Sequence, residues 1–162
     1  QSEQGILGGI YGGKKRNFLK CKKYLNSFCK SVFNFGDVTK ASSAKLLSNF
    51  LSLLTTTSVI EFFKSANKLN VDIKLLCRVA KLGSGNSGAL DRIAGKAIKG
   101  NYKGYVFSVD NTYKDLHYIN DLVSDLPNAN KHIKIAKSFY SDASKKGYGN
   151  YLVSELIDKD KY

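Results

Sequence analysis

The sequence predicts an α+β fold, in which an N-terminal helical lobe precedes a small mixed or antiparallel β-sheet core with one or two helices. Three observations support this prediction. Apolar residues recur at helical spacing through residues 14–68, apolar and β-branched runs follow within residues 69–157, and a glycine-rich turn separates two of these runs. At 162 residues and 43% hydrophobic composition, the chain is long enough for one globular domain.

The chain divides into three segments. Residues 1–13 are glycine-rich and are typical of a flexible leader. Residues 14–68 form the helical lobe and residues 69–162 an α+β core of catalytic type, and we expect the lobe and the core to make one compact domain. Methionine is absent even at position 1, which indicates a fragment of a larger protein.

The helical lobe contains three expected helices. From Lys14 to Phe33, apolar and basic residues alternate as in an amphipathic basic helix, which either packs on the core or binds phosphate or lipid headgroups. A second helix is expected over residues 39–54 and a third over residues 58–68, with the hydroxyl-rich stretch 55–58 interrupting them. The lobe has no evident catalytic constellation, so we assign it to scaffolding or partner contact.

The core is expected to contain about four strands. Its expected elements, in order, are a strand over 71–82, a glycine turn over 83–88 opening a helix at 89–94, a strand over 105–109, a helix over 111–126, a strand over 131–139 that would also suit a helix, and a final strand over 151–157.

Charge and cysteine content limit the classes of partner and site. Lys and Arg total 26 against 13 Asp and Glu, a net charge of +13. This indicates either a solvated surface or an anionic partner, and lysine contacts nucleic acid mostly at phosphate. Three cysteines without paired spacing and two histidines predict no disulfide framework and no metal site. No apolar run approaches the roughly 20 residues of a transmembrane helix, so no such segment is predicted.

Three short stretches resemble the motifs of ADP-ribosyltransferase toxin domains. They are Leu75-Leu76-Cys77-Arg78-Val79, Tyr105-Val106-Phe107-Ser108-Val109-Asp110 and Val153-Ser154-Glu155, and the resemblance spans residues 70–157. In that family an Arg, a Ser and a Glu lie on three strands, and the cofactor is NAD.

The resemblance implies a role for each matching residue. Arg78 would bind the diphosphate of NAD, since guanidinium grips phosphate bidentately. Ser108 would orient Glu155, the catalytic acid, whose carboxylate would bond the ribose and stabilise the cationic transition state as nicotinamide leaves. The other expected cofactor contacts are Gly83, Gly85, Tyr105 and Phe107.

Three alternatives remain open. A metal-independent ribonuclease could use His117 or His132 with neighbouring lysines. The spacing Gly83-x-Gly85-x-x-Gly88, followed by Asp110, resembles the first motif of S-adenosylmethionine methyltransferases, which bind their nucleotide on a doubly wound sheet. A non-enzymatic basic protein that binds nucleic acid is the third.

We therefore predict a cationic toxin or effector domain, released from a larger secreted protein, that transfers ADP-ribose from NAD to an acidic protein or RNA. It would be delivered into the cytosol of a target cell, and an acidic immunity protein could neutralise it.

Overall fold

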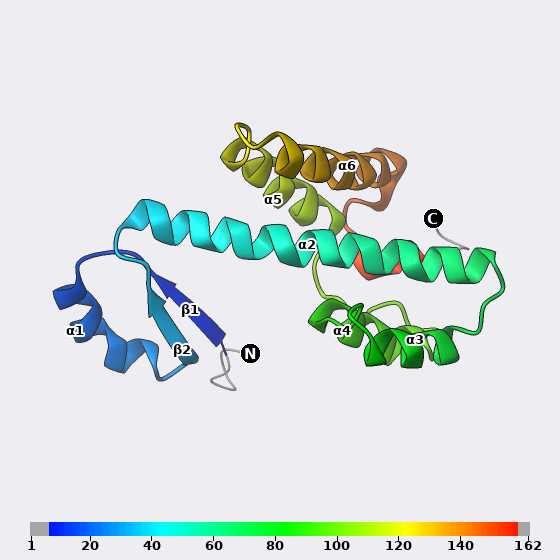
Figure 1. Ribbon diagram of the computed structural model, residues 1–162, viewed down its shortest axis with the longest axis horizontal. Helices are drawn as coiled ribbons and strands as arrows, with labels where there is room; N and C mark the ends of the chain where they lie inside the picture. The colour runs from blue at the N-terminus through cyan, green and yellow to red at the C-terminus, as the bar shows by residue number, and fades with distance from the viewer. Residues whose placement is uncertain (1–6, 159–162) are drawn as a thin grey trace. The chain divides into compact units, whose positions relative to one another are not determined.

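The computed structural model describes residues 7–158 (Figure 1). Residues 1–6 and 159–162, which include the beginning of the expected flexible leader, lie outside this range. The chain forms two compact units, Gln1–Asn49 and Phe50–Tyr162. Each unit has its own internal organisation.

The first unit is a β-α-β arrangement. Strand β1 (Leu7–Tyr11) is followed by helix α1 (Lys15–Leu25) and strand β2 (Cys29–Asn34). The two strands pair in parallel, from Leu7 opposite Cys29 to Tyr11 opposite Asn34. Parallel neighbours need a crossover connection, which α1 provides. The stretch expected to be a linker thus contains a strand at 7–11, and the helix expected over 14–33 ends at Leu25.

The interior of the first unit is small. The rings of Tyr11 and Phe18 pack with centroids 5.2 Å apart, which joins β1 to α1. Cys29 is buried at the beginning of β2. Most other side chains of α1 are exposed, and no residue of this helix is fully buried.

Helix α2 (Val38–Lys68) is continuous where the sequence predicted an interruption. The hydroxyls of Thr55, Thr56, Thr57 and Ser58 each donate to the carbonyl four residues earlier, at 2.8–3.1 Å. The hydroxyls are therefore hydrogen-bonded within the helix, and the backbone hydrogen bonds of the helix continue past them. The expected break at 55–58 is therefore wrong.

The second unit is helical. Besides the part of α2 from Phe50 onward, it contains α3 (Ile73–Leu82), α4 (Gly88–Ala97), α5 (Val109–Leu122), α6 (Pro127–Ala143), the π-helical turn η1 (Ser144–Tyr148) and the 3-10 helix η2 (Val153–Ile157).

The core of this unit lies along α2, between the α3–α4 pair and the α5–α6 pair (Figure 1). One stripe of α2 is buried, comprising Leu53, Thr56, Val59, Ile60, Phe63 and Ala66. The phenol of Tyr140, on α6, is fully buried and hydrogen-bonded to Thr57 on α2 at 3.1 Å. Burial raises the pKa of Tyr140 well above its ordinary value.

The predicted mixed or antiparallel sheet core is wrong. Within residues 7–158 the structure has only the two parallel strands of the first unit and one isolated bridge, between Ser108 and Leu152. The run 71–82 is a helix because Asp72 caps it, its carboxylate accepting the backbone N–H of Lys74 and Leu75. The run 105–109 leads into α5 because Ser108 is an N-cap that accepts from Asn111.

The two later expected strands are also helical. Residues 131–139 lie inside α6, the alternative that their spacing allowed. Residues 153–157 form η2. Pro127 begins α6, since proline suits the first turn of a helix, where its missing N–H has no partner to lose.

Helix α2 is long and apolar enough to cross a membrane, by length and composition alone. Its most apolar stretch has a mean hydropathy of 1.4, and 28% of it is buried. The buried stripe from Leu53 to Ala66 has the spacing of a helix packed against other helices of a core. We therefore interpret α2 as the core helix of the second unit.

Candidate functional site

The carboxyl ends of the two parallel strands mark the candidate site in the first unit. In open parallel sheets, ligands bind outside these ends, where the loops that follow the strands meet. Here β1 leads into Gly12-Gly13 and β2 into Phe35-Gly36. The backbone N–H of Gly13 donates to the carbonyl of Gly36 at 2.7 Å, which ties the two loops together.

Glycine is required in both loops. Gly36 has a φ of +92°, a conformation that favours glycine. A methyl group on Gly12 would lie 2.7 Å from the Asp37 carbonyl oxygen and 2.7 Å from the Ala41 Cβ. Because Gly12 lacks a side chain, the end of β1 packs directly against the first turn of α2.

The first turns of α2 complete this region. Asp37 caps the helix by accepting the backbone N–H of Lys40 at 2.8 Å. That hydrogen bond holds the pKa of Asp37 below its ordinary value. Two turns later, the Lys45 ammonium donates to the Asn49 Oδ1 at 2.9 Å. Lys45 is therefore a cationic proton donor held in place by a neutral amide.

Sequence analysis missed the pair of Lys45 and Asn49. The detectable signal was a lysine and an asparagine four residues apart, on one face of a helix that directly follows a glycine turn. The lobe was assigned to scaffolding or partner contact because it showed no evident catalytic constellation.

The predicted transferase residues do not lie on three strands. Arg78 is exposed on α3, and Gly83 and Gly85 lie in the exposed loop that connects α3 to α4. Ser108 caps α5. Glu155 lies in η2, where its carboxylate accepts the backbone N–H of Leu152 at 3.0 Å.

The structure does bring the segments of Ser108 and Glu155 together. Ser108 bridges to Leu152, and the N–H of Val153 donates to the carbonyl of Phe107 at 2.9 Å. Tyr105 is buried, and its phenol lies 3.0 Å from the Ser52 hydroxyl. These contacts attach the end of the chain to the start of α5, which is a structural role. Cofactor contact by these residues stays a prediction.

The ribonuclease candidates are on helix surfaces. His132 is exposed on α6, with its Nδ1 2.7 Å from the carbonyl oxygen of Asn128 one turn earlier. His117 is exposed on α5, with its Nδ1 2.9 Å from the Lys137 Nζ. Each histidine thus has a different hydrogen-bond partner. Within residues 7–158, no group of His, Cys, Asp and Glu is arranged to hold a metal ion.

Comparison with known proteins identifies the fold. The chain is similar to the solved 3-hydroxyisobutyrate dehydrogenase of Salmonella typhimurium, with a TM-score of 0.85, 22% identity, and coverage of 96% of this chain and 55% of that one. It is also similar to the 3-hydroxyisobutyrate dehydrogenase of Mycobacterium tuberculosis solved with L-serine, with a TM-score of 0.82, 18% identity, and coverage of 99% and 57%. Psf3, solved with NADP+ and 2-OPP, gives a TM-score of 0.82, 19% identity, and coverage of 96% and 54%.

Two curated relatives are distant in sequence. The L-threonate dehydrogenase of Haemophilus influenzae is 24% identical over 155 residues, which cover 95% of this chain and 51% of the relative. The cytokine-like nuclear factor N-PAC of Anopheles gambiae is 22% identical over 162 residues, 100% of this chain and 28% of the relative. The chain thus spans about half or less of the length of the curated relatives it matches.

A family model matches residues 39–158, most of the chain, and contradicts the predicted functions. The model describes the NAD-binding region of a dehydrogenase, so the ADP-ribosyltransferase, ribonuclease, methyltransferase-type and non-enzymatic interpretations are all wrong. The toxin assignment and the secretion it implied are unsupported for the same reason.

One prediction about the chemistry is confirmed, because NAD(P) is the cofactor class of the matched family. The predicted macromolecular target, neutralising partner and cytosolic site of action stay predictions. The chain belongs to the family described as NAD-binding of NADP-dependent 3-hydroxyisobutyrate dehydrogenase.

Proposed function

We propose that this chain forms part of an NAD(P)-dependent dehydrogenase acting on small 3-hydroxy carboxylates, with Lys45 as the acid–base residue. The names of the similar proteins support the substrate class. 3-Hydroxyisobutyrate, L-threonate and L-serine all carry a carboxylate and a hydroxyl on the third carbon. Family membership supports the cofactor.

The region at the carboxyl ends of β1 and β2 fits a dinucleotide in two respects. Gly36 has open space where a side chain would stand, so a ligand can approach the backbone closely there. Within residues 7–49 the one carboxylate is that of Asp37, and it already has the Lys40 N–H and, at 3.7 Å, the Lys40 ammonium as partners. NAD(P), when bound, takes up or delivers the hydride.

Lys45 would handle the proton that accompanies this hydride. Oxidation of an alcohol releases a proton from the hydroxyl, and reduction of the carbonyl returns one, which calls for a positioned acid–base group. The amine of Lys45 would accept the proton in the first direction, and its ammonium would donate it in the second. Asn49 would keep the nitrogen of Lys45 in place through the 2.9 Å hydrogen bond.

The pairing of Lys45 with an amide is the observation that carries this proposal. A lysine paired with a carboxylate has its charge neutralised by that partner, as Lys81 has with Asp91 at 2.7 Å. The partner of Lys45 is neutral, so its positive charge stays available to the substrate oxygen as negative charge develops there.

The test is hydride transfer by the 162-residue chain, with NAD+ or NADP+ as the cofactor and either 3-hydroxyisobutyrate or L-threonate as the substrate. The rate is measured from the increase in absorbance of the reduced nicotinamide. Loss of a general acid–base group typically costs about 10²–10⁴-fold in rate, and we expect a loss of that size for Lys45→Ala. Asn49→Ala should lower the rate less, since the amine remains.

Lys68→Ala is the matched control, because Lys68 is an exposed lysine at the other end of the same helix. It should leave the rate unchanged. Equal rates for wild type and Lys45→Ala would contradict the role of Lys45. Absence of both cofactor binding and turnover in the wild-type chain would contradict the proposed activity itself.

A further inference from the structure

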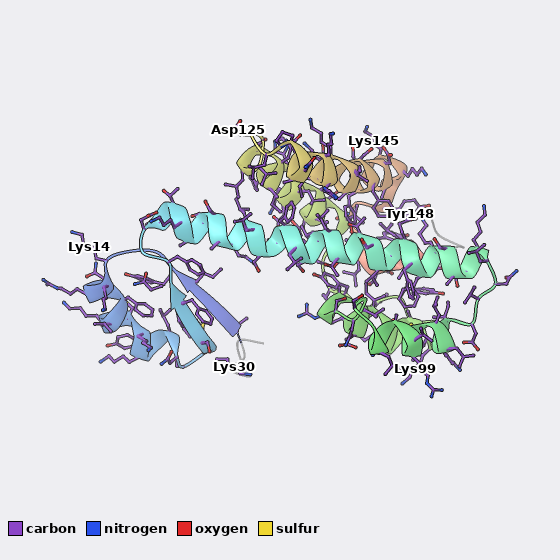
Figure 2. All side chains as sticks on the ribbon, in the orientation of Figure 1. Lys14, Lys30, Lys99, Asp125, Lys145 and Tyr148 are labelled. Carbon is purple, nitrogen blue, oxygen red and sulfur yellow. The ribbon has the colours of Figure 1, made fainter. Side chains whose placement is uncertain are left out.

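Basic side chains cover one side of α1. Between residues 7 and 36 the sequence has seven Lys or Arg and no Asp or Glu. All seven are exposed, and six of them lie within residues 14–23. Figure 2 shows the long side chains of α1 spread outward from the helix, with Lys14 labelled at its start.

Helical spacing orders these side chains into two neighbouring stripes. Arg16, Lys20 and Lys23 follow the spacing i, i+4, i+7 and share one stripe. Lys15 and Lys22 are seven residues apart and form the second stripe, with the exposed Leu19 between them. Phe18 and Leu25, which are half-buried, lie opposite the first stripe and beside Lys22 of the second.

The first turns of this arrangement oppose the stability of the helix, whereas Lys22 and Lys23 in the last turn suit the helix dipole. Lys15 and Arg16 lie in the first turn, where the helix dipole disfavours cations, and this turn has no acidic residue. Arg16 and Lys20 repel each other one turn apart. A local conflict of this kind in a folded element is expected where the residues serve a function.

No carboxylate relieves this charge within the part of the chain that the structure describes. Two of these cations lie over aromatic rings. The Lys23 Nζ is 4.7 Å from the centroid of the Tyr24 ring, and the Lys22 Nζ is 5.9 Å from the centroid of the Phe18 ring. Tyr24 is 65% exposed, so its ring lies at the edge of the basic stripes and is open to a stacking partner.

We infer that the basic face of α1, defined by Lys15, Arg16, Lys20, Lys22 and Lys23, binds the sugar–phosphate backbone of a nucleic acid. This is separate from the proposed dehydrogenase activity and needs none of its residues. Lysine-rich surfaces contact mostly phosphate, so binding should depend little on base sequence. A lone exposed Leu19 among five cations is too little apolar surface for insertion into a membrane interface, which needs a wide apolar face.

The experiment measures the affinity of the full chain for a fluorescein-labelled single-stranded RNA and for a duplex DNA of the same length, by anisotropy over a series of salt concentrations. For single strands each neutralised phosphate contributes about −0.7 to the slope of log K against log salt. The triple variant Arg16→Gln, Lys20→Gln, Lys23→Gln should reduce the magnitude of this slope by about 2 and weaken binding at low salt by about tenfold or more. Comparing the RNA with the DNA shows which polymer is preferred.

The matched control is Lys99→Gln, Lys131→Gln, Lys134→Gln, which removes the same net charge from exposed lysines of the second unit. This control should keep nearly all of the affinity. An equal loss in both triple variants would overturn the assignment to α1, as would an absence of binding to either polymer.

Two further readouts keep the result unambiguous. Circular dichroism should show unchanged helix content in the α1 triple variant, because the substitutions remove repulsion. Cosedimentation with vesicles of phosphatidylcholine containing phosphatidylserine tests whether the same face binds an anionic lipid membrane. Binding to these vesicles that depends on Arg16, Lys20 and Lys23, without binding to nucleic acid, would overturn the proposal.

Discussion

The Asp110 side chain lies directly against the backbone of Gly149, and the Asp110 N–H donates to the Gly149 carbonyl at 3.0 Å. A methyl group placed on Gly149 would come within 2.6 Å of the Asp110 Cγ. The Ser144 hydroxyl donates to the same carboxylate at 2.6 Å. Position 149 therefore holds glycine for space, since its φ of −54° is one that any residue adopts.

Gly149→Ala should push the Asp110 carboxylate aside and destabilise the second unit by about 0.5–1.5 kcal/mol, the usual net worth of a hydrogen bond such as the one from Ser144 that would be lost. Gly95→Ala is the control, and it should raise the free energy of unfolding. Gly95 lies in α4 with open space around its Cα, and alanine in a helix is favoured over glycine by about 0.5–1 kcal/mol. Urea denaturation of both variants measures the two shifts, and a stabilising Gly149→Ala would contradict the packing described.

Tyr140→Phe should change how stability depends on pH. Burial raises the pKa of Tyr140 in the folded protein, whereas an unfolded tyrosine titrates near pH 10. Above about pH 10 the unfolded chain releases this proton and the folded chain keeps it, so the free energy of unfolding falls by about 1.4 kcal/mol per pH unit. The contribution is complete below about pH 10 and is lost as the pH rises toward the folded pKa.

The variant lacks this titration, so its free energy of unfolding should fall less steeply than that of the wild type above about pH 10. Near neutral pH it should be less stable by about 1 kcal/mol, because the hydrogen bond to Thr57 is gone. Guanidinium denaturation at several alkaline pH values gives both slopes. All other titrating groups are shared, so parallel slopes would show that Tyr140 ionises as easily folded as unfolded.

Phe63→Ala tests the interpretation of α2 as a core helix. Phe63 is fully buried, and truncation of such a side chain costs about 3–5 kcal/mol. Leu51→Ala, on the same helix, removes a side chain that is 69% exposed and should change stability by no more than about 0.5 kcal/mol. Thermal denaturation followed by circular dichroism compares the two, and equal shifts would contradict the buried stripe.

Ser154→Ala should detach the loop before α5 from η2. The buried Ser154 hydroxyl donates to the Tyr102 carbonyl at 2.5 Å and accepts the Tyr105 N–H at 3.1 Å. Removing it leaves the buried Tyr105 N–H and the half-buried Tyr102 carbonyl without this partner, at a cost of about 1–3 kcal/mol. Ser27→Ala removes an exposed hydroxyl bonded to the Tyr24 carbonyl, and its smaller effect provides the control. Hydrogen exchange at the Tyr105 amide should be faster only in the first variant.

The sequence identified where several helices occur but not the nature of the core. The start of the second helix and both ends of the helix after Asp110 were located within a few residues, because their apolar positions follow one face. The run 71–82 was taken for a strand because α3 also carries exposed apolar residues, Leu75, Val79 and Leu82, opposite the inward Cys77. With apolar residues on both sides of a helix, periodicity no longer distinguishes it from a buried strand.

The candidate site was harder to predict for a different reason. Lys45 and Asn49 become distinctive only when α2 is known to begin at the carboxyl ends of two parallel strands. Both strands are short, and β1 is rich in glycine, so that it has the composition of a linker. The cofactor was predicted correctly, but from a motif resemblance that the helical structure contradicts.

The four hydroxyl residues in the middle of α2 have a consequence for anything that packs beside them. A hydroxyl carries a single proton, and those of Thr55, Thr56 and Ser58 are directed at carbonyls of their own helix. The proton of Thr57 has two acceptors, the Leu53 carbonyl oxygen at 2.8 Å and the Tyr140 phenol oxygen at 3.1 Å. At Thr57 the segment therefore offers a donor to a neighbouring helix, and a side chain there satisfies it only by presenting an accepting oxygen, as the phenol does.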